Sequence, residues 1–214
     1  MNLESMNLRW EKLLLKFGVE QQMAQSLFLD LSSFYSSSER HYHTLTHIQH
    51  FLSVVETLTP RAENLEAIEL AAWFHDLIYD SKAKDNEEKS ADYAESILKS
   101  LAIPGEVIAQ VKRLILRTKS HQITEEDDLD TKIMLDADLA ILGVEDAEYG
   151  RYAQAIRWEY SWVGDEDYRK GRTQFLQSLL KRPKIYQMEE VFEALETKAR
   201  NNLREELNSM RYLS

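Results

Sequence analysis

Apolar residues recur every three or four positions along nearly the whole chain, which is the period of an amphipathic helix. In the first half, breaks at glycine, proline and polar stretches divide this pattern into six segments. The pattern predicts one helix that ends at Gly18 and others over about residues 20–35, 44–59, 63–79, 86–103 and 105–119.

The second half of the chain continues in the same way. An acidic stretch at 125–130 predicts a solvated loop, and a short helix over about 132–142 is expected to stop at Gly143. Two or three long helices with polar faces follow over 146–212, broken near Gly164 and Pro183. No repeat or flexible linker divides the chain, so we predict one all-α domain over 1–214, a bundle of eight to ten helices.

Composition supports the helical prediction and restricts the chemistry. Glycine and proline together make up about 4% of the chain, against about 12% on average, which disfavours sandwiches, barrels and many-stranded α/β folds. The absence of cysteine excludes disulfides, thiolate metal sites and a cysteine nucleophile. Any metal ion must therefore be held by His, Asp, Glu or water.

Charge narrows the expected partners. The formal net charge of −11 disfavours binding to nucleic acid polymers but allows a small anionic substrate in a locally positive pocket. The longest apolar runs fall far short of the about 20 residues of a membrane span, and the N-terminus lacks a secretory hydrophobic region. We expect a cytoplasmic protein without membrane contact, and the sequence does not predict its oligomeric state.

Histidines are concentrated in one stretch. Four of the six lie at positions 41–50, and His75 is followed directly by Asp76. His47 shares a helical face with Phe51, and His75 shares one with Ala72, so both imidazoles point toward the expected core. Periodicity allows two readings: core histidines bonded to carbonyls with Asp76 exposed, or half of a divalent metal site.

A further acidic ligand is available in the string MLDADLAILG. Asp136 shares a face with Leu139, whereas Asp138 lies closer to Leu135 and Leu142. Carboxylates inside an apolar helix are unusual, because a buried unpaired carboxylate is costly. Periodicity does not choose between the two aspartates.

A histidine, a later His-Asp pair and a distant Asp together resemble the signature of the HD superfamily of metal-dependent phosphohydrolases. The strings HYHTLTHI, AAWFHDLIYD, NEEKSA, LDADLAILG and IRWEY extend the resemblance over about 35–205, to a branch of single-domain proteins described as predicted HD phosphohydrolases. The resemblance implies an HD-type helical bundle, with a metal-site core at about 40–145 and the helices of 146–212 packed on it. It implies the metal ligands His47, His75, Asp76 and Asp136.

This N/O ligand set suits one or two divalent ions per chain, from among Mn, Fe, Zn, Ni, Co and Mg. The run Tyr42-His43-Thr44-x-x-His47 also resembles the Tyr-His-Asn-x-x-His run of cyclic-nucleotide phosphodiesterases, although Thr44 replaces the asparagine. That likeness makes His43 the candidate general acid, the alternative being an exposed loop histidine. Asp76 or Asp136 is also a candidate for orienting the attacking water. His121 is a second candidate acid, or a residue at a helix end.

Arginines are candidates for contacting phosphate, because guanidinium pairs with it bidentately. We name Arg117, Arg157 and Arg172, and the alternative for each is ordinary surface charge or an ion pair. The expected activity is hydrolysis of a small phosphate ester, a nucleotide by analogy with the family, as a monoesterase or a diesterase. The alternatives are a non-catalytic sensor that binds metal and nucleotide, or an oxidative di-metal enzyme on the same scaffold.

Overall fold

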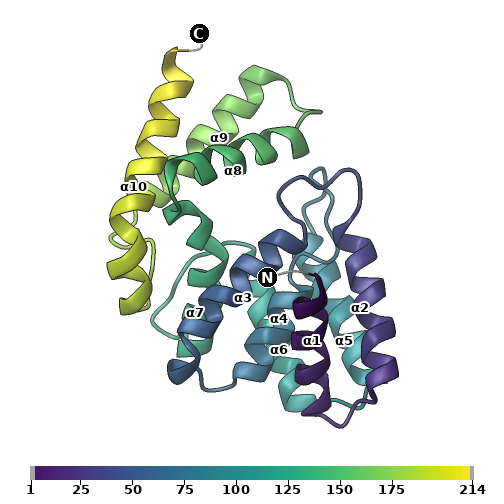
Figure 1. Ribbon diagram of the computed structural model, residues 1–214. Helices are drawn as coiled ribbons and strands as arrows, with labels where there is room; N and C mark the ends of the chain where they lie inside the picture. The colour runs from purple at the N-terminus through teal and green to yellow at the C-terminus, as the bar shows by residue number, and fades with distance from the viewer. Residues whose placement is uncertain (1–2, 213–214) are drawn as a thin grey trace. The chain divides into compact units, whose positions relative to one another are not determined.

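A computed structural model describes residues 3–212, which form ten α-helices and two short 3-10 helices and contain no strand (Figure 1). The prediction of an all-α chain is confirmed. Contacts within the chain divide it into two compact units, residues 1–134 and 135–214. Within the described residues, no helix is both long enough and apolar enough to cross a membrane. The packing of the C-terminal helices on the metal-site core stays a prediction.

The first unit is built around one apolar helix. Its elements are α1 (Leu3–Leu15), α2 (Gln21–Tyr35), α3 (Leu45–Thr57), η1 (Thr59–Arg61), α4 (Leu65–Phe74), α5 (Asn86–Ser100), α6 (Gly105–Thr118) and the start of α7 (Leu129–Leu139). In α4, every residue from Ala67 to Phe74 is buried, and the helix packs against α1, α3, α5 and α6. A helix that is buried on all sides belongs at the centre of a bundle.

Side-chain caps set the beginnings of the two helices that carry the histidines. The Thr44 hydroxyl accepts a hydrogen bond from the amide of Thr46 and caps α3, as its position in the sequence predicted. The side-chain oxygen of Asn64 accepts from the amide of Ala67 and caps α4. The predicted end of α4 was wrong. The sequence pattern predicted a helix to about residue 79, but α4 ends at Phe74 and the chain then turns.

The acidic stretch at 125–130 is not a purely solvated loop. Asp130 is fully buried, and its carboxylate accepts hydrogen bonds from the amides of Glu63 and Asn64 and from Nε2 of Gln110. The prediction was therefore wrong for Asp130. Three donors replace the water lost on burial, and they connect the start of α7 to the start of α4.

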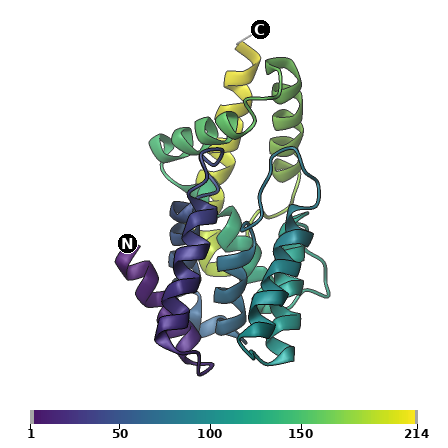
Figure 2. The ribbon, with the colours of Figure 1, turned by 90° about the vertical axis from the view of Figure 1, so that its right-hand side faces the viewer.

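The second unit contains the end of α7, then η2 (Ala140–Gly143), α8 (Asp146–Glu159), α9 (Asp165–Leu180) and α10 (Glu189–Tyr212). Within this unit α10 packs against η2 and runs beside α9 (Figure 2). The predicted breaks at Gly143, Gly164 and Pro183 are confirmed, since each lies at the end of a helix or between helices.

Gly143 is required by the contact between η2 and α10. A Cβ added there would lie 2.6 Å from Cβ of Leu195, so the two backbones approach too closely for a side chain. Asn202 on α10 is buried and donates to the carbonyls of Leu142 and Val144, which η2 leaves without helical partners.

Candidate metal centre

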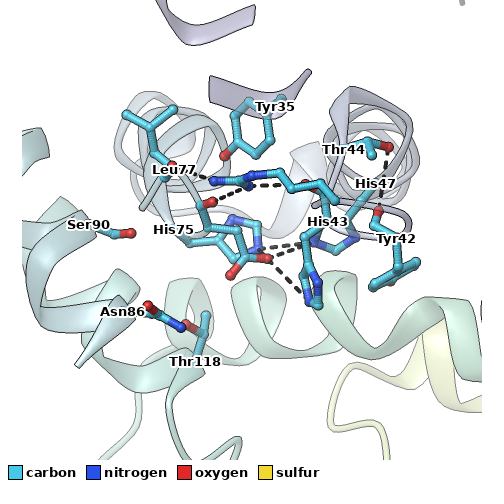
Figure 3. Close-up of polar contacts among 12 residues, drawn as sticks. Tyr35, Tyr42, His43, Thr44, His47, His75, Leu77, Asn86, Ser90 and Thr118 are labelled. Atoms are coloured by element: carbon cyan, nitrogen blue, oxygen red, sulfur yellow. Dashed lines mark hydrogen bonds and ion pairs between the residues drawn. The ribbon is translucent and has the colours of Figure 1, made fainter. Parts of the chain in front are cut away.

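Three ligand-type side chains meet at the junction of α3 and α4. His47 lies in the first turns of α3, His75 caps the C-terminus of α4, and Asp76 follows it; both imidazoles are buried. Nε2 of His75 lies 3.1 Å from Nε2 of His47 and 3.0 Å from Oδ2 of Asp76, and the remaining distance, His47 Nε2 to Asp76 Oδ2, is 3.4 Å. Figure 3 shows the rings of His43, His47 and His75 turned toward one another.

The backbone determines which nitrogen of His75 carries hydrogen. Nδ1 lies 3.0 Å from the carbonyl oxygen of Ala72, which can only accept, so Nδ1 is the donor. In the neutral ring, Nε2 then carries a lone pair. This nitrogen faces Nε2 of His47 and Oδ2 of Asp76. Hydrogen carried by one of the imidazole nitrogens, or a metal ion, can bridge these atoms.

Asp76 supplies the negative charge of this cluster. Burial raises its pKa, but the charges of His75 and His43 in their protonated forms, and hydrogen bonds from His47 and His75, outweigh burial and hold the pKa well below its usual value. The carboxylate is therefore ionised at neutral pH, as a metal ligand must be.

The spacing of the three atoms fits a divalent ion. Nitrogen and oxygen ligands lie about 2.1 Å from such an ion, so neighbouring ligands at right angles are about 3 Å apart. The observed separations of 3.0, 3.1 and 3.4 Å fall close to that value. The three residues belong to a group of His and Asp side chains able to hold a metal ion.

His43 lies beside the cluster. Its Nε2 is 3.9 Å from Oδ2 of Asp76, and its side chain is 18% exposed. Its ring packs on Tyr79, with centroids 4.2 Å apart and planes inclined by 30°. The structure thus brings His43 to the candidate ligands, with its nitrogen near the carboxylate and partly open to solvent.

Arg40 also belongs to the site, and the sequence analysis missed it. It lies in the loop between α2 and α3, where periodicity carries no information, and it is 8% exposed. Its guanidinium donates to the carbonyls of His43, Asp76 and Leu77. The only sequence signal was its position directly before the histidine-rich stretch.

Asp136, which the resemblance assigned to the metal, contacts the backbone of its own unit. Its oxygens accept hydrogen bonds from the amides of Gln187, at 2.8 and 2.9 Å, and Met188, at 2.7 Å. Burial raises the pKa of Asp136 to about 7, and these hydrogen bonds oppose the rise. Asp138, the alternative that periodicity left open, lies two residues further along α7.

The three predicted phosphate-binding arginines all have carboxylate partners. Arg117 bonds Asp127 at 2.6 Å, and Arg157 bonds Asp165 at 2.6 Å and the carbonyl of Tyr160 at 2.7 Å. These pairs and backbone contacts stabilise turns within each unit.

Arg172 is the most enclosed of the three arginines. It is 7% exposed and bonds both carboxylate oxygens of Glu206, at 2.8 and 3.0 Å, and the Tyr152 hydroxyl at 3.2 Å. Its charge is neutralised inside the second unit. A phosphate contact by any of the three arginines stays a prediction.

His121 follows the end of α6 and adopts φ +48°, a left-handed conformation that few residues other than glycine occupy. Its predicted catalytic role stays a prediction.

The chain was compared with protein families, curated proteins and solved structures. No family model, curated protein or solved structure matches it. The case for a metal centre therefore rests on the geometry of its own side chains.

Proposed function

We propose that this protein is a metal-dependent phosphohydrolase of the HD type, which holds a divalent ion through His47, His75 and Asp76, with an aspartate of α7 as the fourth ligand that the resemblance to the HD superfamily implies. The observation that supports the proposal is the convergence of two imidazole nitrogens and an ionised carboxylate on one point, with His75 held by Ala72 in the tautomer that ligates through Nε2. The reaction class comes from the resemblance to the HD superfamily.

Asp138 is proposed as the fourth ligand instead of Asp136. Both oxygens of Asp136 accept amide hydrogens of Gln187 and Met188, and turning that carboxylate to a metal would leave buried amides without acceptors. The set of two imidazoles and two carboxylates suits Mn, Fe, Zn, Ni or Co, and Mg less well.

A bound divalent ion lowers the pKa of coordinated water and neutralises charge on a phosphoryl oxygen. The chain supplies the remaining functions. Asp76 stays ionised close to both ligand imidazoles. His43 presents Nε2 at the open side of the cluster and, when protonated, gives that proton to the leaving oxygen of the ester.

The proposed substrate is a small phosphate ester, with nucleotides as the first class to test. A net charge of −11 repels polyanions at long range, whereas a small ester experiences mainly the local field of the metal and the neighbouring side chains.

Metal analysis of the purified protein tests the proposed site. The wild type should retain one or two divalent ions per chain, and Asp76→Asn should lose them. The matched control is Asp85→Asn, which changes an exposed aspartate paired with Lys89 outside the site and should leave the metal content unchanged. Full metal content in Asp76→Asn would contradict the assignment.

A panel of nucleotides and other phosphate esters, assayed with Mn²⁺, Co²⁺, Ni²⁺ and Mg²⁺, tests the reaction. Turnover that disappears in His43→Gln while metal is retained supports hydrolysis with His43 as the acid. Binding without turnover across the panel would replace the enzyme with a non-catalytic sensor.

A further inference from the structure

Arg40 connects two segments that carry the proposed chemistry. Its Nη1 donates to the carbonyl of His43 at 3.0 Å and to that of Asp76 at 2.7 Å, and its Nη2 donates to the carbonyl of Leu77 at 2.6 Å. The first carbonyl lies in the loop before α3, and the other two lie just beyond the end of α4. One side chain therefore joins the backbone of the candidate acid to the backbone of a candidate ligand.

The position of this guanidinium follows from the way α4 ends. Once the helix stops at Phe74, the carbonyls of the next residues lack helical amide partners and need other donors. A planar guanidinium offers five N–H groups in a rigid fork and satisfies several carbonyls at once, whereas a lysine ammonium is a compact point charge on a flexible stem.

Tyr79 extends the same arrangement to the ring of His43. The guanidinium carbon of Arg40 lies 5.4 Å from the ring centroid of Tyr79, and the His43 ring packs on Tyr79 at 4.2 Å. The preceding residue, Ile78, is held at its amide by the hydroxyl of Ser90 on α5. Arg40 thus contacts both the backbone of His43 and the aromatic ring on which its imidazole rests.

We infer that Arg40 is a positioning residue, which holds the loop of His43 against the end of α4 and so sets the separation between Nε2 of His43 and the carboxylate of Asp76. The inference deepens the proposed function and rests on it for the chemical meaning of His43 and Asp76. In this role Arg40 acts through three carbonyls.

The test compares Arg40→Gln and the milder Arg40→Lys with a matched control. Arg200 serves as the control because its guanidinium also donates to carbonyls beyond a helix end, those of Arg182 and Pro183 after α9. Arg200→Gln and Arg200→Lys remove the same kind of contact in the other unit. All variants are first checked for wild-type helical content by circular dichroism.

The first measurement uses metal-free protein. The ring of Tyr79 shields the ring protons of His43, whose NMR signals are assigned by their loss in His43→Gln. At a pH at which the imidazole is neutral, both Arg40 variants should move these signals toward the values of an unstacked histidine. Both Arg200 variants should leave them unchanged.

The second measurement is Co²⁺ binding, followed by titration calorimetry and visible absorption. Loss of a residue that orients ligands raises a metal dissociation constant by about 10–100-fold, and we expect this range for Arg40→Gln and a smaller rise for Arg40→Lys. The Arg200 variants should bind Co²⁺ as the wild type does, with the same spectrum.

Folded Arg40 variants with wild-type His43 signals and wild-type Co²⁺ affinity would overturn the inference. Failure of both Arg40 variants to fold would also overturn it, because Arg40 would then serve stability alone. If the wild type binds no Co²⁺, the proposed function fails, and the His43 signals of the metal-free protein still decide whether Arg40 positions that ring.

Discussion

His75 shows how one backbone contact determines the chemistry of a side chain. The carbonyl of Ala72 holds the hydrogen on Nδ1 and leaves Nε2 as the ligating atom. The partner of that bond lies three residues earlier in the same chain, so the tautomer is set as soon as the last turn of α4 forms. The contacts that bring His47 and Asp76 to this nitrogen are added by tertiary folding.

The two aspartates of α7 should separate metal binding from stability. Loss of a residue that only orients a ligand weakens metal binding by about 10–100-fold. Asp138→Asn should weaken Co²⁺ binding by more than this, since it removes a proposed ligand. Asp136→Asn should leave Co²⁺ binding nearly intact but lower the free energy of unfolding by about 1–3 kcal/mol, because its amide group faces the amides of Gln187 and Met188. Titration calorimetry measures Co²⁺ binding, and urea unfolding measures stability. If Asp136→Asn weakened Co²⁺ binding and Asp138→Asn did not, Asp136 would be the ligand.

Asp128 should make stability depend on pH. Burial raises its pKa, but hydrogen bonds from Arg113 and Thr131 outweigh burial and hold the pKa below the ordinary value of 3.8. A carboxyl with a lowered folded-state pKa stabilises the protein fully above its unfolded pKa, and this contribution is lost as the pH falls through the folded pKa. The loss of stability caused by Asp128→Asn should therefore be largest from pH 5 to 7 and shrink toward pH 3.

Urea unfolding of wild type and Asp128→Asn at several pH values measures this difference. Asp165→Asn is a suitable comparison, since the carboxylate of Asp165 also pairs with an arginine but is 82% exposed. Exposed pairs contribute little, so this variant should change stability only slightly at every pH. A constant difference for Asp128→Asn between pH 7 and pH 3 would contradict the prediction.

At the scale of elements, the contact between η2 and α10 depends on the absence of a side chain at Gly143. Gly143→Ala should destabilise the second unit by about 1–3 kcal/mol, because the new Cβ meets Leu195 at 2.6 Å and its backbone oxygen at 3.0 Å. Gly150→Ala is the matched control on α8, where nothing lies within 4 Å of the added Cβ, and it should stabilise by about 0.4–1 kcal/mol.

Chemical denaturation measures the free energy of unfolding of the two variants, which should fall in Gly143→Ala and rise in Gly150→Ala. Equal effects of the two alanines would show that η2 and α10 adjust to the added methyl group, and that the close approach is not required.

Helix positions were predictable from the sequence, but some helix ends were not. Thr44 and the glycines at 143 and 164 signal boundaries through local geometry, and the helices begin or end there. The end of α4 lacks such a signal, because the donor to the carbonyls after it is Arg40, 36 residues earlier than Asp76. Asp130 is similar, since its carboxylate partners the amide of Glu63, 67 residues away.

For the whole molecule, the proposed metal centre should couple ion binding to stability. An ion that binds the folded chain and not the unfolded one stabilises it by about 2.7 kcal/mol at 100 times its dissociation constant. Addition of Co²⁺ should therefore raise the melting temperature of the wild type, and a chelator should reverse the effect.

His75→Gln should remove most of this shift, whereas His41→Gln should preserve it, because His41 does not belong to the ligand group. A metal-induced shift of equal size in His75→Gln would place the bound ion at another site.

The sequence by itself determined the helical class, most helix positions and the candidate group of His47, His75 and Asp76. These follow from periodicity, residue type and neighbours in the chain, which are local properties. Only the tertiary structure revealed the contacts of Arg40, the burial of Asp130 and the partners of Asp136 and Arg172. Each of these depends on groups far apart in sequence, and a buried charge takes its function from the partners that folding places beside it.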